Sequence, residues 1–80
     1  MALNDLYRKQ IEEEKEQLEK SLAEIVKIIS MLETGVKIYP ESTAINLNKF
    51  YKEMLKNAQL GKETFEKGIA ELGKIIESLK

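Results

Sequence analysis

The chain contains neither cysteine nor histidine. Without cysteine it forms no disulfide and no thiolate metal site, and without histidine it lacks the commonest metal ligand and proton shuttle. Tryptophan is absent, proline occurs once, and no apolar run reaches the roughly 18 residues that indicate a transmembrane helix. These absences leave little on which catalysis can be built. We therefore expect a protein that is not an enzyme and that holds no metal and no cofactor.

Small size is a further restriction. Eighty residues make one domain, residues 1–80, and such a short chain buries only about 60 to 65% of the surface that its unfolded form exposes. With disulfides and metals excluded, self-association is the remaining way to add stability. The N-terminal residues lack the basic start and apolar core of a signal peptide, so we expect a cytoplasmic location, although leaderless export would leave no such signal.

Charged residues are abundant but balanced. They make up 34% of the chain, and the formal net charge is only −1. Nearly all the basic residues are lysine and nearly all the acidic ones are glutamate, both of which favour helices. Interleaved charges of this kind are typical of solvated helix faces, and they give no strong field toward a polyanion.

Two apolar ladders with helical spacing occupy the two halves of the chain. The first consists of Ile11, Leu18, Leu22, Ile25, Ile29 and Leu32. The second consists of Leu47, Tyr51, Met54, Ala58, Gly61, Phe65, Gly68, Leu72, Ile75 and Leu79, and it is widened by Phe50, Leu55, Ile69 and Ile76. These patterns predict an all-α fold, a long antiparallel helical hairpin with heptad-like packing.

The expected boundaries follow from local signals. We expect a first helix at about 4–34 capped by Asn4 or Asp5, a connection at about 35–41, and a second helix at about 42–79. Gly35 suits the left-handed position that often ends a helix, Pro40 disfavours helical geometry in the residue before it, and Ser42 is the preferred cap of the second helix. The alternative is a three-helix bundle with a break near 57–62, where weak helix formers cluster.

Gly61 and Gly68 lie seven residues apart on the second ladder. Each would cost a helix about 0.8 to 1 kcal/mol relative to alanine unless something compensates. Close packing of the facing helix, with a side chain such as Leu18 or Ile11 entering a groove at the glycines, is the favoured interpretation. A hinge, or a docking groove for the helix of another protein, is the alternative.

A two-helix layer leaves half of each apolar face uncovered, so we expect dimerisation to complete a four-helix bundle. The expected packing and oligomer interface comprises Leu18, Leu22, Ile25, Ile29, Leu32, Met54, Ala58, Gly61, Phe65, Gly68, Leu72 and Ile76. The connection carries the apolar residues Val36, Ile38 and Tyr39, which either fold back as a lid over the bundle end or form a tip that docks a partner.

Clusters of like charge suggest two further sites. The carboxylates of Glu12, Glu16 and Glu19 share a helical face. Carboxylate metal sites in helical bundles also use histidine, which this chain lacks. We therefore expect solvated ion pairs, such as Glu16 with Lys20, and no metal site there. The ridge of Lys49, Lys52 and Lys56 is a weak nucleic-acid signal, because three lysines neutralise few phosphates. Membrane binding is disfavoured because glutamates, not lysines, flank the apolar stripe of the first helix.

In layout alone, the chain is similar to three groups of helical hairpins. In expected architecture it is similar to the small four-helix bundles of the plasmid RNA-binding Rop type. In length and in its proline-containing turn, Tyr39-Pro40-Glu41-Ser42, it resembles the needle subunits of type III secretion and their small hairpin chaperones. Needle subunits usually carry two prolines close together in the turn, and this chain has one, so no residue roles carry over.

The sequence therefore predicts a module for protein–protein interaction or oligomerisation. Its expected partner is a second copy of itself, through the apolar helix stripes, as an adaptor or structural subunit. Two alternatives remain open. The chain could be a subunit or chaperone-like hairpin of a hetero-complex, for example a secretion apparatus, or a small nucleic-acid-binding regulator that uses the lysine ridge.

Overall fold

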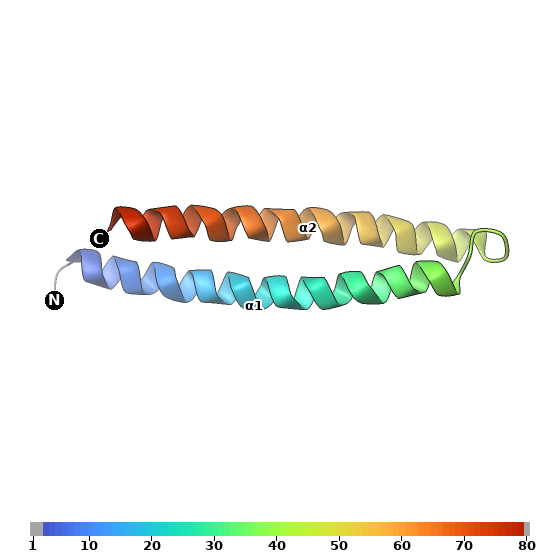
Figure 1. Cartoon of the computed structure of the whole chain (residues 1–80), viewed down its shortest axis with the longest axis horizontal. Coiled ribbons are helices and arrows are strands. Elements are labelled where there is room, and N and C mark those ends of the chain that lie inside the picture. Colours follow the sequence, from blue (N-terminus) through green and yellow to red (C-terminus); the bar gives the residue numbers. More distant parts are fainter. Residues whose placement is uncertain (1–2, 80) are drawn as a thin grey trace.

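The computed structural model describes residues 3–79, which form two long helices lying side by side in opposite directions (Figure 1). Helix α1 spans Leu3–Ile38 and α2 spans Ile45–Ser78. The hairpin is extended, at 63 × 14 × 12 Å, and the start of α1 and the end of α2 lie at the end opposite the turn. The predicted all-α hairpin is confirmed. The three-helix alternative is wrong, because α2 continues without interruption through residues 57–62.

Both helices carry ion pairs between exposed side chains. Arg8 Nε lies 3.3 Å from a carboxylate oxygen of Glu12, and Lys20 Nζ lies 3.9 Å from one of Glu16, as the sequence led us to expect for the second pair. Exposed pairs of this kind contribute only a few tenths of a kcal/mol each, about 0.3 to 0.5. The stability of the helices therefore depends mainly on the stripe that α1 and α2 bury against each other.

The turn begins later than the sequence signals predict. Gly35 does not end α1, since no glycine in the described chain has a positive φ and the helix continues to Ile38. The reason is that Gly35 is needed inside the helix, where the ring of Tyr51 packs directly against its backbone. Pro40 acts as expected on Tyr39, which lies outside both helices.

The helix caps also differ from the expected ones. Ser42 lies in the turn, and the N-cap of α2 is Ala44, which makes no side-chain capping hydrogen bond. The backbone N–H groups of Thr43 and Ala44 instead donate to the carbonyl of Pro40, at 3.1 and 2.9 Å. Asn4 and Asp5, proposed as caps of the first helix, lie within α1.

The two helices meet along a continuous seam that is only half-buried. In the described chain no hydrophobic side chain is fully buried, and Gly35 and Asn48 are the only residues in that class. The half-buried seam residues are Ile11, Leu18, Leu22, Ile25, Ile29, Leu32 and Val36 in α1, with Tyr51, Leu55, Ala58, Phe65, Ile69, Leu72 and Ile76 in α2.

Three members of the predicted second ladder lie beside this seam and not in it. Leu47, Met54 and Ile75 are exposed, and their neighbours Asn48, Leu55 and Ile76 face α1 in their place. Along much of α2 two neighbouring residues per turn are apolar. The helical period of the sequence therefore does not decide which of the two packs against α1.

Candidate protein interface

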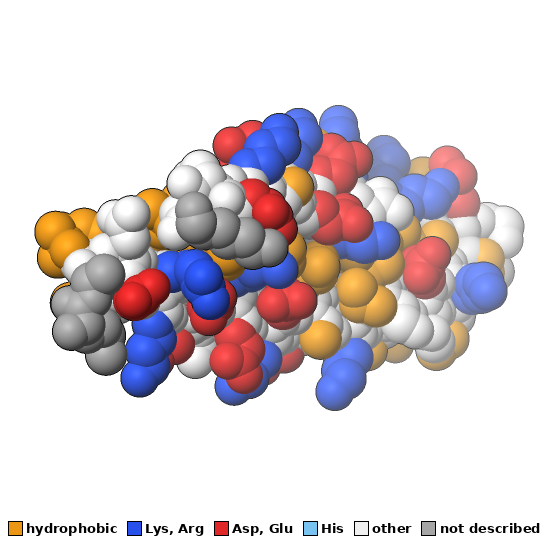
Figure 2. All heavy atoms as spheres, turned by 60° about the vertical axis from the view of Figure 1, so that its left-hand side comes forward, with side chains coloured by type: hydrophobic (Ala, Val, Ile, Leu, Met, Phe, Trp, Pro, Cys, Tyr) orange, Lys and Arg blue, Asp and Glu red, His pale blue; other side chains and the backbone are white. Residues whose placement is uncertain are grey.

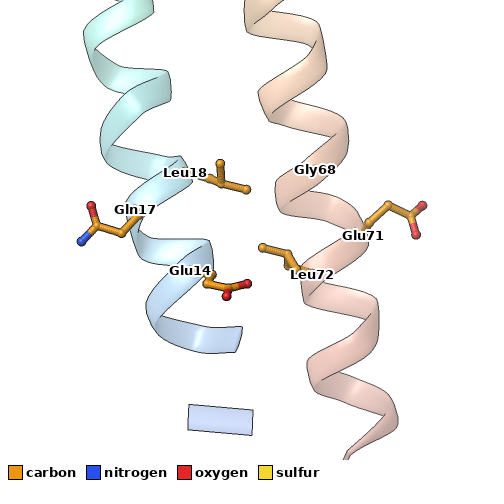
Figure 3. Close-up of a pocket in the computed structure, with 6 residues that line it drawn as sticks. All are labelled: Glu14, Gln17, Leu18, Gly68, Glu71 and Leu72. Carbon is orange, nitrogen blue, oxygen red and sulfur yellow. The ribbon is translucent and has the colours of Figure 1, made fainter. Parts of the chain in front are cut away.

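An open groove of about 560 Å³ runs between the helices near the end that carries the termini. Glu14, Gln17 and Leu18 of α1 and Gly68, Glu71 and Leu72 of α2 line it. Leu18 and Leu72 point toward each other across the gap, and Gln17 and Glu71 point away on either side (Figure 3). The groove thus has an apolar floor and polar rims, with space above Gly68 where a larger residue would place its side chain.

The glycines of α2 differ in what faces them. A Cβ atom at Gly68 would lie 3.5 Å from Leu18 Cδ1, and one at Gly61 would lie 3.8 Å from Ile25 Cδ1, both ordinary contact distances. The packing of Leu18 against Gly68 is the one that the sequence analysis favoured. Nothing lies within 4 Å of the corresponding position at Gly73. The hairpin itself therefore has room for a methyl group at all three positions.

Gly35 is the contrasting case. A Cβ atom there would lie 2.6 Å from Tyr51 Cδ1 and 2.7 Å from Cε1, closer than real Cβ atoms approach. The Tyr51 ring is itself held in place, stacked on Tyr39 with 5.6 Å between centroids and an interplanar angle of 8°. Phe50 meets the same ring edge-on at 5.5 Å. The turn end of the hairpin is therefore closed by an aromatic cluster seated on a glycine.

Asn48 lies beside this cluster, and its side chain is 3% exposed. Its Nδ2 group donates to the carbonyl of Tyr39 at 2.8 Å and to that of Val36 at 3.3 Å. Carbonyls at the C-terminal end of a helix have no partner within that helix, so the α2 side chain caps α1. The Oδ1 atom of Asn48 is buried and has no hydrogen-bond partner within residues 3–79.

The groove identifies one side of the hairpin, which we call the groove face. Residues seven apart on a packed helix lie along one line, so the four groove residues other than Leu18 and Leu72 define four rows in steps of seven. In α1 one row takes every seventh residue from 3 to 38 and the other every seventh residue from 7 to 35. In α2 the corresponding rows run, again by sevens, from 47 to 75 and from 50 to 78. The opposite face consists of rows 5 to 33 and 9 to 37 in α1, with 45 to 73 and 49 to 77 in α2.

Exposed apolar side chains concentrate on the groove face. Thirteen large hydrophobic residues of the described chain are exposed, and nine belong to it: Leu3, Tyr7, Ile28, Met31, Ile38, Leu47, Phe50, Met54 and Ile75. Met31 is the most exposed of these at 71%. The groove face has three charged residues, all of them glutamate, whereas the opposite face has thirteen of both signs. In the view of Figure 2, hydrophobic side chains lie between bands of charged ones.

The predicted lysine ridge lies on the opposite face. Lys49, Lys52 and Lys56 are all exposed, and Lys52 Nζ lies 3.8 Å from a carboxylate oxygen of Glu41. The ridge shares this face with Glu63 and Glu66, so its positive charge is not continuous.

The structure divides the predicted interface residues into two groups. Eleven of the twelve are half-buried in the seam between α1 and α2, and Met54 is exposed beside it at 42%. Of the predicted tip residues, Val36 is half-buried within α1, Tyr39 is held by Tyr51, and Ile38 is exposed at 61%. The additional groove-face residues Ile28, Met31, Leu47 and Phe50 were missing from the predicted site, although their apolar character in a highly charged chain was a usable signal.

Within residues 3–79, no group of three or more histidine, cysteine, aspartate or glutamate side chains is arranged to hold a metal ion. Neither helix combines the length and apolarity that crossing a membrane requires.

Comparison with protein-family models, with curated proteins and with solved structures finds no match for this chain.

Proposed function

We propose that this chain is a non-enzymatic protein-interaction module that associates with a second copy of itself into a four-helix bundle. The observation that carries the proposal is the lack of a buried apolar side chain anywhere in residues 3–79, together with an apolar groove face. A helix hairpin on its own is a single layer, and domains are built from at least two. For its location, the cytoplasm remains the prediction from the sequence.

The exposed area supports the proposal quantitatively. The chain exposes 6193 Å². A compact protein of 9.2 kDa is expected to expose about 4,900 Å², so the hairpin carries an excess of about 1,300 Å². A stable interface of standard size removes about 800 Å² from each partner. The excess of the hairpin is therefore larger than the area that such an interface would cover on each copy.

Sedimentation equilibrium over a hundredfold concentration range, with helicity measured on the same samples, tests this function. We expect a strongly helical dimer, and a chain that stays monomeric throughout would contradict self-association. A monomer that is poorly helical would instead favour the hetero-complex alternative, in which another protein covers the groove face.

A charge-reversal variant serves as the matched control. Changing Lys49, Lys52 and Lys56 together to glutamate alters only the opposite face, so the dimer should remain. The same protein tests the nucleic-acid alternative. We expect no mobility shift with the native chain at micromolar concentration and low salt, and a shift that this variant abolishes would support the regulator.

A further inference from the structure

We propose that the two copies pack groove face on groove face in opposite directions, so that Met54 of each copy enters the groove of the other at Gly68 and Met31 lies at the rim of that groove. This inference rests on the proposed self-association and specifies which face is used and in what register.

The positions along the hairpin come from three contacts between α1 and α2. Gly35 lies against Tyr51, Gly61 against Ile25, and Gly68 against Leu18. In each pair the two residue numbers add to 86, so residue i of α1 is level with residue 86 − i of α2. Met31 is therefore level with residue 55, one residue from Met54, and the two methionines lie on the groove face toward the turn. The groove lies toward the other end, level with residues 14 to 18 of α1.

Met54 lies seven residues from Gly61 toward the turn, and Gly68 lies seven residues from Gly61 on the other side. Met31 lies six residues from Ile25 toward the turn, and Leu18 of the groove lies seven residues from Ile25 on the other side. A two-fold axis in the plane of the interface, crossing the helices at the level of Ile25 and Gly61, therefore places Met54 of one copy opposite Gly68 of the other. It places Met31 one residue beyond Leu18, at the rim of the groove. Because the axis lies close to the middle of the hairpin, nearly the whole length of the two copies overlaps. The contact occurs twice in the dimer, as two-fold symmetry requires.

The same axis gives four pairs of facing positions, in two of which a large residue meets a small one. In the central α2 row of the groove face, it brings Gly61 opposite Gly61, Met54 opposite Gly68, and Leu47 opposite Ile75. In α1 it brings Ile28 within one residue of Ser21. Methionine is unbranched and fills irregular gaps well, which suits an open groove with an apolar floor. This self-complementarity is the reason to choose a second copy as the occupant.

The area of the face agrees with this occupant. The hairpin is 63 Å long. Two adjacent helices are about 20 Å wide, so one face presents about 1,300 Å². That area is more than the roughly 800 Å² that each partner buries in a stable dimer of standard size. The thirteen charged residues of the opposite face would by contrast have to be desolvated in a dimer that used that face.

The first test compares leucine at two glycines. Gly68→Leu fills the groove from inside, whereas Gly73→Leu makes the same chemical change on the opposite face, where nothing lies within 4 Å. Both changes improve helix propensity, and the hairpin has room for both Cβ atoms. We expect the dimer dissociation constant to rise at least tenfold for Gly68→Leu and to stay within threefold for Gly73→Leu. Equal dissociation constants would overturn the proposal.

A second pair of variants avoids the glycines. Met31→Ala combined with Met54→Ala removes only side chains that are exposed in the single hairpin. Leu60→Ala is the control, because Leu60 is 54% exposed and lies outside the groove face. We expect at least tenfold weaker dimerisation for the double variant with unchanged helicity, and a much smaller change for the control.

The direction of packing is tested by one distance. The chain has no cysteine, so Ser78→Cys gives a single site for a nitroxide spin label. In the proposed dimer the two labels lie about 50 Å apart, from 34 residue levels at a rise of 1.5 Å each. In a dimer with both turns at one end, they lie within about 25 Å, since two packed helices are about 10 Å apart.

These outcomes separate the two proposals. A chain that is monomeric at all concentrations contradicts self-association, and the register with it. A dimer with a short distance between the Ser78→Cys labels, or one that tolerates Gly68→Leu, overturns the register alone.

Discussion

Replacing Gly35 with alanine should destabilise the hairpin even though alanine is the better helix former. In a helix interior the change from glycine to alanine is worth about 0.8 to 1 kcal/mol. At Gly35 the added Cβ would lie 2.6 to 2.9 Å from three atoms of the Tyr51 ring. Unstrained carbon contacts are about 3.5 to 4.0 Å, so helix or ring must move by close to 1 Å.

Two aromatic neighbours restrict the movement of the Tyr51 ring. It is stacked on Tyr39 and bounded edge-on by Phe50, and displacing it loses aromatic contacts worth about 0.5 to 1.5 kcal/mol each. Overpacking of a well-packed site costs about 1 to 3 kcal/mol. After subtraction of the propensity gain, we expect Gly35→Ala to lower the free energy of unfolding by up to about 2 kcal/mol.

Urea denaturation followed by far-ultraviolet circular dichroism measures this change, with all variants at the same protein concentration because association adds to apparent stability. Gly73→Ala is the matched control, and we expect it to raise the free energy of unfolding by up to about 1 kcal/mol, since its Cβ meets nothing within 4 Å. In a Tyr51→Ala background, Gly35→Ala should also become stabilising. The reasoning is refuted if Gly35→Ala stabilises the native chain as much as Gly73→Ala does.

Two further substitutions test the seam. Asn48→Ala should lower the free energy of unfolding by about 1 to 3 kcal/mol, because it leaves the carbonyls of Val36 and Tyr39 without their donor. Asn48→Asp should lower it further, because carboxylate oxygens would face those carbonyls. Chemical denaturation measures both changes. Phe65→Ala should cost about 2 to 3 kcal/mol, toward the lower end for a phenylalanine because the side chain is only half-buried, and an unchanged thermal midpoint would show that Phe65 is not part of the seam.

The fold was predictable from the sequence because its signals are long and repeated. Two ladders of helical period and one proline between them suffice for a hairpin, and the balanced lysines and glutamates agree with it. The turn was less predictable. Gly35 has the right residue type and place for a helix end, and only the position of Tyr51 on the other helix reveals that it serves a close contact. Sequence periodicity contains no information about that contact.

The candidate interface was predictable only in part. The residues chosen from the ladders are nearly all used within the hairpin, where α1 and α2 pack together. The groove face lies one row to the side, and its residues, such as Met31 and Phe50, were scattered among polar neighbours in the linear sequence. Recognising the face required knowing which rows of the two helices share a side, and that depends on the register of the hairpin.

Asn48 has a consequence for how that register is chosen. A seam of leucine and isoleucine repeats every seven residues, so sliding α2 along α1 by one repeat would exchange apolar neighbours for similar ones. The carbonyls that accept from Asn48 are free only at the C-terminal end of α1, because those farther back are bonded within the helix. A slipped hairpin would bury the amide without acceptors. One polar side chain therefore distinguishes the correct alignment from its near-equivalents, by locating the end of the neighbouring helix.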